Sequence, residues 1–331
     1  MHLGVDAGNS KSAALVCRSD GQVIGAGRSS GGDIYGIARP ADAVTSVLTC
    51  ARQAMTSAGV QPAMITTAAF RLAGVDWPED HAFWRASLAT ALPELRQVSI
   101  LNDGFAAIRC GAPSGVAVAI VAGTGSAVAG RGPDGREWSL SWWVQEAVGG
   151  FGIGDEALRA VCRAALGLGA QTTLTAAVLN EYQHQDVEAM LHSFTRREHR
   201  RPWQDKGRLA RAVLAAASAG DPVAAGIVQQ QARHFAEYAR VAAVKAGFDP
   251  ARDTVPVVLA GSILTAEHSP VAETLTGLLA IEIPKSRPVL ANLPPVAGAA
   301  LDAIAAAGVI ITENTLRAVG RSLPQQDFLQ T

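Results

Sequence analysis

The chain has 331 residues, of which 49% are hydrophobic and 17% charged, and its formal net charge is −1. This length favours two domains that can each bury a core, and so balanced a charge excludes an overall field that would attract nucleic acid. No apolar run reaches the ~18 residues that a membrane span needs, and Met1-His2 leads directly into a predicted strand, so we expect no signal peptide and a cytoplasmic protein.

The four cysteines are isolated along the chain. None of Cys17, Cys50, Cys110 and Cys162 belongs to a C-x-x-C pair. This usage is typical of reduced core thiols, and it argues against disulfides, zinc ligands or an iron–sulfur site.

Strands and helices alternate in the first third of the chain. The apolar runs predict strands at 4–7, 13–16 and 22–27, a helix at 41–58, a strand at 65–72, a turn at 73–76, a helix at 79–92, a strand at 98–101, and a helix directly after Asn102-Asp103. Segment 111–115 contains Pro113 and Ser114 and is typical of a connector. We therefore predict domains at 1–112 and 113–331.

The rest of the chain carries more helix. The pattern predicts strands at 118–122 and 127–129, helices at 154–166, 174–182, 205–219 and 222–246, a strand at 255–259, and helices from Ser269-Pro270 and at 294–307. The tail after Thr312 is polar and expected at the periphery, with the last helix packing back toward the hinge. Such alternation favours an α/β fold with a mixed sheet in each half and a ligand between the halves.

Two stretches repeat one pattern. Each has a buried strand, a turn of small residues, a returning strand and an Asp-Gly hairpin; the turns are Gly8-Asn9-Ser10-Lys11 and Gly123-Thr124-Gly125-Ser126. Because only small residues let a phosphate approach the main chain, two such turns across a cleft could offer backbone N–H groups to one polyanion. A nucleoside triphosphate is therefore the leading ligand.

Two aspartates end strands beside these turns. Asp6 is placed to hold magnesium (Mg2+) or its water, and Asp103 could accept a proton from a substrate hydroxyl. Each also has an ordinary structural interpretation: Asp6 can stabilise a turn, and Asp103 can cap the following helix. The hydroxyls of Thr124 and Ser126 could bind phosphate or simply suit a tight hairpin. The specific signal is the joint occurrence of these residues in two repeated halves.

Other motifs are weaker. The chain has no G-x-x-x-x-G-K-[ST] loop. The glycine-rich run 149–154 lacks the G-x-G-x-x-G register and is interpreted as a loop entering a helix near Gly154. The basic run 196–201 has no interleaved aromatic residues and is interpreted as a solvated loop or helix face, so nucleic-acid binding is not expected.

These residues resemble the N-acetylglucosamine kinase and BadF-BadG-BcrA-BcrD-type ATPase family, within the actin–hexokinase–heat-shock ATPase superfamily. The resemblance covers residues 3 to about 305 in family order. It implies two actin-like (ribonuclease H-like) domains with mixed sheets flanked by helices and an active site in the interdomain cleft. It further implies ATP and Mg2+ as cofactors, Asp103 as catalytic base, a substrate-side turn with Gly74 and Val75, and a homodimer. The ATP-binding positions implied are Gly8, Asn9, Ser10, Lys11, Gly123, Thr124, Gly125, Ser126, Gly261, Ser262 and Gly298.

The sugar-side positions depart from the family pattern. Where these kinases usually carry Gly-Trp-Gly and then Gly-Asp-Glu, this chain has Ser139-Leu140-Ser141 and Gln145-Glu146-Ala147. Glu146 thus replaces a sugar-contacting Asp, and Asp33 stands where the family has a sugar-contacting Asn. The carboxylates of Asp33 and Glu146 favour a hydroxyl-rich or amine-bearing substrate over an N-acetyl sugar.

The function predicted is an ATP-dependent kinase that phosphorylates a hydroxyl of a small sugar, a hexose or an amino sugar. Two alternatives stay open: a nucleotide-driven conformational ATPase that acts on a partner protein, and a sugar or nucleotide sensor. The absence of clustered cysteines disfavours the first, and the intact Asp103 disfavours the second.

Overall fold

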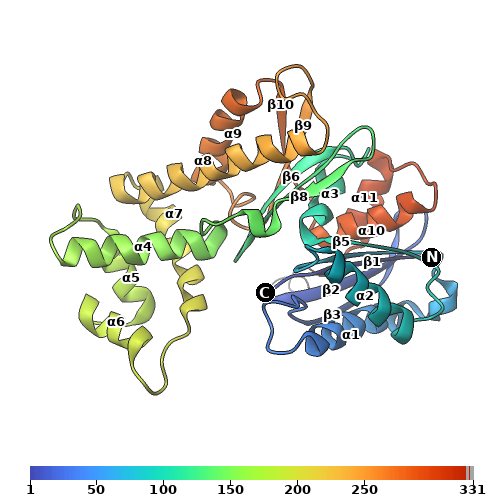
Figure 1. Ribbon diagram of the computed structural model, residues 1–331, viewed down its shortest axis with the longest axis horizontal. Helices are drawn as coiled ribbons and strands as arrows, with labels where there is room; N and C mark the ends of the chain where they lie inside the picture. Colours follow the sequence, from blue (N-terminus) through green and yellow to red (C-terminus); the bar gives the residue numbers. More distant parts are fainter. Residues whose placement is uncertain (326–327, 329–331) are drawn as a thin grey trace.

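Two five-stranded sheets with the same topology form the core of the protein (Figure 1). The computed structural model describes residues 1–325 and 328. The first sheet has the order β3-β2-β1-β4-β5 and consists of β1 His2–Ala7, β2 Lys11–Cys17, β3 Val23–Ser30, β4 Thr67–Leu72 and β5 Gln97–Asn102. The second has the order β10-β9-β6-β7-β8 and consists of β6 Ala117–Ala122, β7 Ser126–Arg131, β8 Glu137–Ser139, β9 Val255–Ala260 and β10 Ser286–Leu290. The repeat seen in the sequence is thus a repeat of architecture.

Strand pairing brings the predicted turns to one edge of each sheet. In the first sheet β1 pairs parallel with β4, and β4 with β5, so Ala7 lies opposite Leu72 and Leu72 opposite Asn102. The residues that follow these three strands therefore leave the sheet side by side. In the second sheet Ala122 pairs with Ser126, and Val121 with Ala260, which places the turn 123–125 beside the end of β9.

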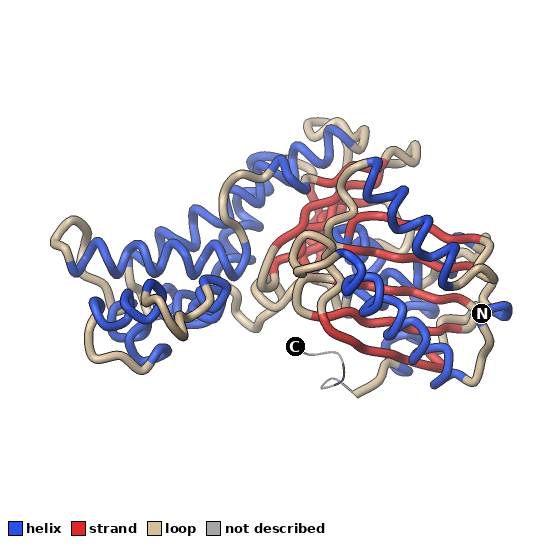
Figure 2. Tube along the Cα trace, turned by 60° about the horizontal axis from the view of Figure 1, so that its bottom comes forward, coloured by secondary structure: helices blue, strands red, loops and turns tan. Residues whose placement is uncertain are grey.

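The helices flank the sheets and extend the second half. They are α1 Pro40–Ala58, α2 Pro78–Ala91, α3 Ile108–Gly111, α4 Gly149–Ala165, α5 Leu174–Tyr182, α6 Val187–Thr195, α7 Ala210–Ser218, α8 Pro222–Lys245, α9 Pro270–Glu282, α10 Pro295–Ala306 and α11 Glu313–Ser322. Four short 3-10 helices are η1 Pro62–Met64, η2 Asp103–Ala107, η3 Ser141–Trp143 and η4 Trp203–Leu209. Helices α4 to α7 form a lobe that projects away from the sheets (Figures 1 and 2).

Alternation along β2 shows how the first sheet is covered on both faces. Ala14 and Val16 belong to the core cluster that includes residues of α1. Leu15 and Cys17 point the other way, into a cluster with Val296 and Leu301 of α10. In the second sheet η2 and α3 cover one face, and α8 covers the other. The helices α3 and α10 therefore lie between the two sheets.

Two glycines permit this close packing. A Cβ on Gly4 of β1 would lie 2.2 Å from the backbone nitrogen of Ala300, and one on Gly298 of α10 would lie 1.8 Å from the carbonyl oxygen of Ala106. Only glycine fits at such approaches of backbone to backbone. The chain from α10 onward thus returns to the first sheet, and the division between domains at 112 and 113 stays a prediction.

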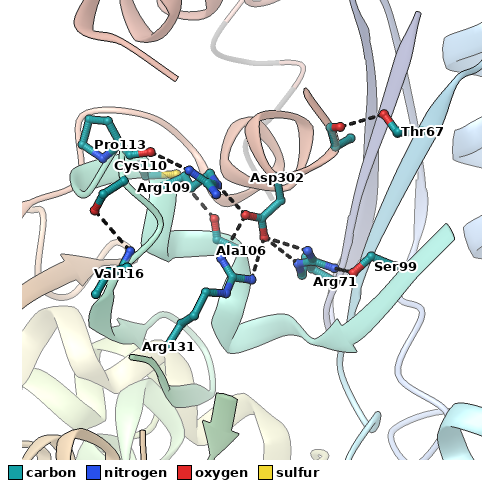
Figure 3. Close-up of polar contacts among 12 residues, drawn as sticks. Thr67, Arg71, Ser99, Ala106, Arg109, Cys110, Pro113, Val116, Arg131 and Asp302 are labelled. Carbon is teal, nitrogen blue, oxygen red and sulfur yellow. Dashed lines mark hydrogen bonds and ion pairs between the residues drawn. The ribbon is translucent and has the colours of Figure 1, made fainter. Parts of the chain in front are cut away.

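Asp302 joins elements from both halves through a buried ion-pair cluster (Figure 3). Its carboxylate, 5% exposed, accepts hydrogen bonds from Arg71 of β4, Arg109 of α3 and Arg131 of β7 at 2.7 to 3.1 Å. Burial alone would raise the pKa of Asp302, but the three guanidinium charges outweigh it and hold this pKa well below its usual range.

The structure differs from the sequence prediction in several elements. Helix α4 begins at Gly149, five residues before the predicted start, and the predicted helix 205–219 divides into η4 and α7. Helices α6 and α11 and strand β10 were not predicted. All four cysteines are free, as expected. Across the described part of the chain, no single helix combines the length and apolar composition of a membrane span, although η4–α7 and α8 meet both criteria as a pair bent by 114°.

Candidate active site

Asp103 stands where β5 ends and η2 begins, half-buried at the common edge of the first sheet. The cap of η2 is its neighbour: Asn102 Oδ1 accepts a hydrogen bond from the backbone N–H of Gly104 at 2.9 Å. The helix-start therefore has a capping side chain in Asn102. The carboxylate of Asp103 is available for other chemistry.

Four carboxylates influence one another at this edge. Burial raises the pKa of Asp103 to about 8, and the negative charges of Asp6, Asp33 and Asp76 add to the shift. Burial also raises the pKa of Asp6 to about 7, against the opposing charge of Lys11. Asp6, Asp33 and Asp103, all singled out in the sequence, are thus gathered in one place. Acidic side chains with raised pKa values at one place, here Asp6 and Asp103, are typical of a functional site.

The same cluster fits a magnesium ion held in part by substrate. In the described residues, no group of three or more histidine, cysteine or acidic side chains is arranged as a closed metal site. Magnesium at phosphate-transfer sites is usually held by one or two carboxylates together with phosphate oxygens and waters. Asp6 supplies a buried oxygen donor whose pKa is raised by desolvation, and a nearby cation would favour its ionised form.

Both small-residue turns leave open space above their glycines. A Cβ on Gly8, Gly123 or Gly125 would meet no atom within 4 Å. The turns are tight, since the N–H of Gly8 donates to the Lys11 carbonyl and that of Gly123 to the Gly125 carbonyl, each at 2.9 Å. Asn9, Ser10 and Thr124 are exposed, while Lys11 and Ser126 are half-buried. These turns can therefore receive a ligand, and their contact with ATP stays a prediction.

The glycine-rich run 149–154 anchors the second turn, and its interpretation as a loop was wrong. It forms the first turns of α4, where the N–H groups of Gly150 and Phe151 donate to the carbonyls of Gly123 and Thr124 at 2.8 Å. A Cβ on Gly149, whose φ is +77°, would lie 2.5 Å from the Gly125 oxygen. Gly149 and Gly150 lie against the turn backbone, and a Cβ on Gly152 or Gly154 would clash with the carbonyl of Ala147 or Lys206.

The predicted adenosine glycines lie in different surroundings. Gly261 follows β9 with φ +86°, and a Cβ there would lie 2.3 Å from the Ala122 carbonyl, next to the second turn; Ser262 beside it is exposed. Gly298 is buried inside α10 against Ala106. Helix packing accounts for Gly298, and its role at adenosine stays a prediction.

An open cavity of about 400 Å³ lies beside Asp103, between the two halves of the chain. It is lined by Asn102 and Phe105, by residues 75–77 and by η3 with β8. Four of the six tryptophans of the chain line it: Trp77, Trp138, Trp142 and Trp143. Trp77, Trp142 and Trp143 are 41%, 50% and 70% exposed. Large aromatic side chains left so exposed around a cavity indicate a ligand-binding surface.

Asp76 is the residue of this cavity that sequence reasoning missed. Its Oδ1 accepts hydrogen bonds from Asn102 Nδ2 at 2.8 Å and from Ser141 Oγ at 2.6 Å, which joins β5, the 73–76 turn and η3. Burial raises the pKa of Asp76, and the two hydrogen bonds oppose the shift. The signal that could have found it is an aspartate that ends the 73–76 turn, four residues after β4.

Of the other predicted substrate-binding residues, Gly74 and Val75 lie near Asp33 or the cavity, whereas Glu146 does not line the cavity. Gly74, with φ +75°, lies against Asp33: a Cβ there would be 2.6 Å from the Asp33 Oδ1, and Val75 lines the cavity. Glu146 is exposed and accepts a hydrogen bond from the hydroxyl of Tyr238 on α8. Its contact with substrate stays a prediction.

The sequence was compared with models of known protein families. The model of the BadF/BadG/BcrA/BcrD ATPase family matches residues 3–303. The chain belongs to this family. The resemblance inferred from the two turns and Asp103 is thereby confirmed.

Relatives of known name share the fold over most of their length. An N-acetyl-D-glucosamine kinase of Dictyostelium discoideum is 23% identical over 269 residues, covering 78% of this chain and 84% of its own. A Chromobacterium violaceum structure described as an N-acetylglucosamine kinase is 26% identical with a TM-score of 0.66, covering 91% of this chain and 98% of its own. The structure of a ROK family glucokinase of Streptomyces griseus, in complex with glucose and AMPPNP, is 18% identical with a TM-score of 0.60. The match covers 93% of this chain and 99% of the glucokinase. The expected fold of two actin-like domains is confirmed.

Substitution of Gly125 by valine tests the second turn. Because a Cβ at Gly125 meets no protein atom, we expect Gly125→Val to fold normally while its methyl groups occupy the space above the turn. ATP affinity measured by calorimetry should fall about tenfold or more, a loss of at least ~1.4 kcal/mol. Gly277→Val, at an equally open position in α9, is the control. Unchanged ATP affinity in a folded Gly125→Val protein would argue against a phosphate site here.

Proposed function

We propose that this protein is an ATP-dependent kinase that transfers a phosphoryl group to a hydroxyl of a small sugar, a hexose or an amino sugar. The observation that carries the proposal is the position of Asp103, at the strand edge that also bears the first small-residue turn and beside the tryptophan-lined cavity. The names of the relatives, N-acetylglucosamine kinases and a glucokinase, support the same reaction class.

The transfer needs a proton acceptor, and Asp103 is suited to that role. The sugar hydroxyl gives its proton to the Asp103 carboxylate while its oxygen bonds to the γ-phosphorus, and the bond from phosphorus to the bridging oxygen of ADP breaks. A base works best when its pKa is near the working pH, and burial with three neighbouring carboxylates brings that of Asp103 to about 8. Magnesium, held near Asp6, would offset the charge of the phosphates. The turns at 8–11 and 123–126 would orient them through backbone N–H groups.

The cavity offers two kinds of contact to a sugar. The exposed rings of Trp142 and Trp143 can cover the apolar C–H face of a pyranose, and the edge of Trp142 meets Tyr35 of the other half with centroids 5.4 Å apart. Asp76 and Asn102 line the cavity and present oxygen and nitrogen atoms to hydroxyl groups, and Asp33 lies against Gly74 next to this lining. Aromatic walls with a few directed polar groups are the usual composition of small-molecule sites.

A coupled assay of ADP release over hexoses, amino sugars and their N-acetyl forms tests the function. Sugar-dependent ADP release supports the proposal. ATP hydrolysis that no sugar accelerates would instead favour a conformational ATPase, and binding without turnover would favour a sensor. Cytoplasmic location and a homodimer are part of the proposal.

The choice among sugars should depend on Asp33. Its negative charge contributes to the raised pKa values of Asp76 and Asp103, so it lies close to both carboxylates. A carboxylate opposite an amide carbonyl leaves two acceptors unpaired, at a cost of about 1–3 kcal/mol each. We expect free hexoses or amino sugars to exceed their N-acetyl forms in kcat/KM about tenfold or more, and Asp33→Asn to narrow this gap.

Two variants control that experiment. Asp134→Asn removes an exposed carboxylate of the Asp-Gly hairpin and should leave the preference unchanged. Glu146→Gln tests the second departure from the family pattern; given its hydrogen bond with Tyr238, we expect a smaller effect than at Asp33. If the wild type prefers N-acetylglucosamine, the argument from carboxylates is wrong, although the kinase proposal would survive.

A further inference from the structure

The projecting lobe contains a second cavity, far in the sequence from the strand ends that form the candidate active site. It encloses about 310 Å³ between the ends of α5 and α6 and the segment that follows α6. The basic run 196–201, interpreted from the sequence as a solvated loop, supplies most of its wall: Arg196, His199, Arg200 and Arg201 line it together with His184. The basic run therefore lines a cavity and does not form only an exposed charged surface.

The charges of this cavity are unbalanced. Three guanidinium groups and two imidazoles face a single carboxylate, that of Asp205, which pairs with Arg201 Nη1 at 3.1 Å. Within the described residues, Arg200 makes no ion pair or side-chain hydrogen bond. Two buried nitrogens, His184 Nε2 and Arg201 Nε, also have no hydrogen-bond partner there. A buried donor without an acceptor, such as the Arg201 Nε–H, is unfavourable, and an anion in the cavity would supply an acceptor to it and to His184 Nε2 when that nitrogen carries a proton.

The wall is held in place before any ligand binds. The Arg201 guanidinium stacks 4.7 Å above the Tyr182 ring, and its backbone N–H donates to the Ser193 carbonyl at 2.7 Å. Arg196 holds the turn by donating Nε to the His199 carbonyl at 2.8 Å. Such anchoring reduces the entropy lost when the arginines bind a ligand.

We propose that this cavity is a binding site for a phosphate group, either free phosphate or the phosphate of a small phosphomonoester. Guanidinium groups match the planar spacing of phosphate oxygens and bind them through paired, charge-assisted hydrogen bonds. The Tyr182 and Phe194 rings beside the site are buried, and Trp203, which stacks on Phe194 and is 40% exposed, does not line the cavity. The cavity therefore recognises the phosphate group and not a nucleobase.

The position of the site connects it to the second small-residue turn. Helix η4 begins directly after Pro202, and a Cβ on its Gly207 would lie 3.6 Å from Thr124 Cγ2. The carbonyl of Lys206 in the same helix abuts Gly154 of α4, whose start bonds to the 123–125 turn. One short helix thus separates the anion cavity from the turn.

Calorimetry on the full chain, saturated with AMPPNP to fill the ATP site, tests the proposal. Inorganic phosphate and glycerol 3-phosphate are titrated separately into wild type, Arg200→Gln and Arg197→Gln. Arg200 is exposed and lines the cavity, so its loss should weaken binding about tenfold without affecting folding. Arg197 belongs to the same run but does not line the cavity, so Arg197→Gln should stay within about twofold of wild type.

The comparison of ligands identifies the source of the phosphate. Tighter binding of glycerol 3-phosphate assigns the site to a phosphomonoester, and equal or tighter binding of phosphate assigns it to the free ion. The proposal is overturned if neither ligand binds the AMPPNP-saturated protein, or if both variants weaken binding equally, as a diffuse field would. Arg200-dependent binding of a short oligonucleotide in place of either ligand would also overturn it.

Discussion

Replacement of Asp103 by asparagine should lower turnover by about 10²–10⁴-fold, the usual contribution of a positioned proton acceptor. Asparagine keeps the size and most hydrogen bonds of aspartate but cannot take a proton. Because Asn102 already caps η2, the substitution removes no cap. ATP affinity should change little, and steady-state kinetics with calorimetry separate the two effects. Turnover close to that of wild type would show that Asp103 is not the base.

The same variant should be more stable than wild type in the absence of ligands. The folded-state pKa of Asp103, about 8, lies above its ordinary value, so between the two the folded state binds more protons than the unfolded state. Its stability therefore falls as pH rises from about 4 to about 8. Asp103→Asn removes this loss, and we expect its Tm to exceed that of wild type at pH 8 by more than at pH 5. A merely structural carboxylate would show the opposite difference.

Part of the candidate site could be predicted from local sequence patterns. Both glycine turns were predicted because small residues interrupt two buried strands, and in the structure a Cβ on Gly8, Gly123 or Gly125 would meet no atom within 4 Å. Asp6 and Asp103 were found because parallel pairing puts the ends of β1 and β5 at one edge of a sheet. The sequence pattern that indicates each turn or aspartate lies within a few residues of it.

Contacts between distant segments could not be predicted in the same way. Gly298 was assigned to the adenosine site from its motif, yet in the structure it lies in a helix packed on Ala106. The tryptophan cavity combines residues 77 and 138–143, which only the meeting of two halves brings together. Strand β10 was missed because Pro288 and the exposed Arg287 break its apolar pattern at the edge of a sheet. The surroundings of Gly298, the cavity and strand β10 depend on burial and on pairing between segments distant in the sequence.

Replacement of Asp302 by asparagine should lower the free energy of unfolding by about 3–5 kcal/mol, the usual effect of removing one partner from a buried ion pair. Arg71 and Arg109 would lose their counter-charge at the contact of α3, α10 and both sheets, and Arg131 would keep only its pair with Glu137 (Figure 3). Urea denaturation measures the change. Asp42→Asn, which breaks an exposed pair with Arg39, should change stability by less than about 1 kcal/mol.

The pH dependence of the Asp302 contribution has a defined sign. Its folded-state pKa is depressed, so its stabilisation is present above its ordinary unfolded pKa, near 4, and is lost as pH falls below that value. The difference in stability between wild type and Asp302→Asn should therefore be constant from pH 6 to 8 and shrink in acid. Should Asp302→Asn fail to fold, Arg109→Gln, which removes one of the three cations, gives a weaker version of the same test. A difference that does not depend on acid would show that packing of α10, and not charge pairing, makes Asp302 necessary where the two halves meet.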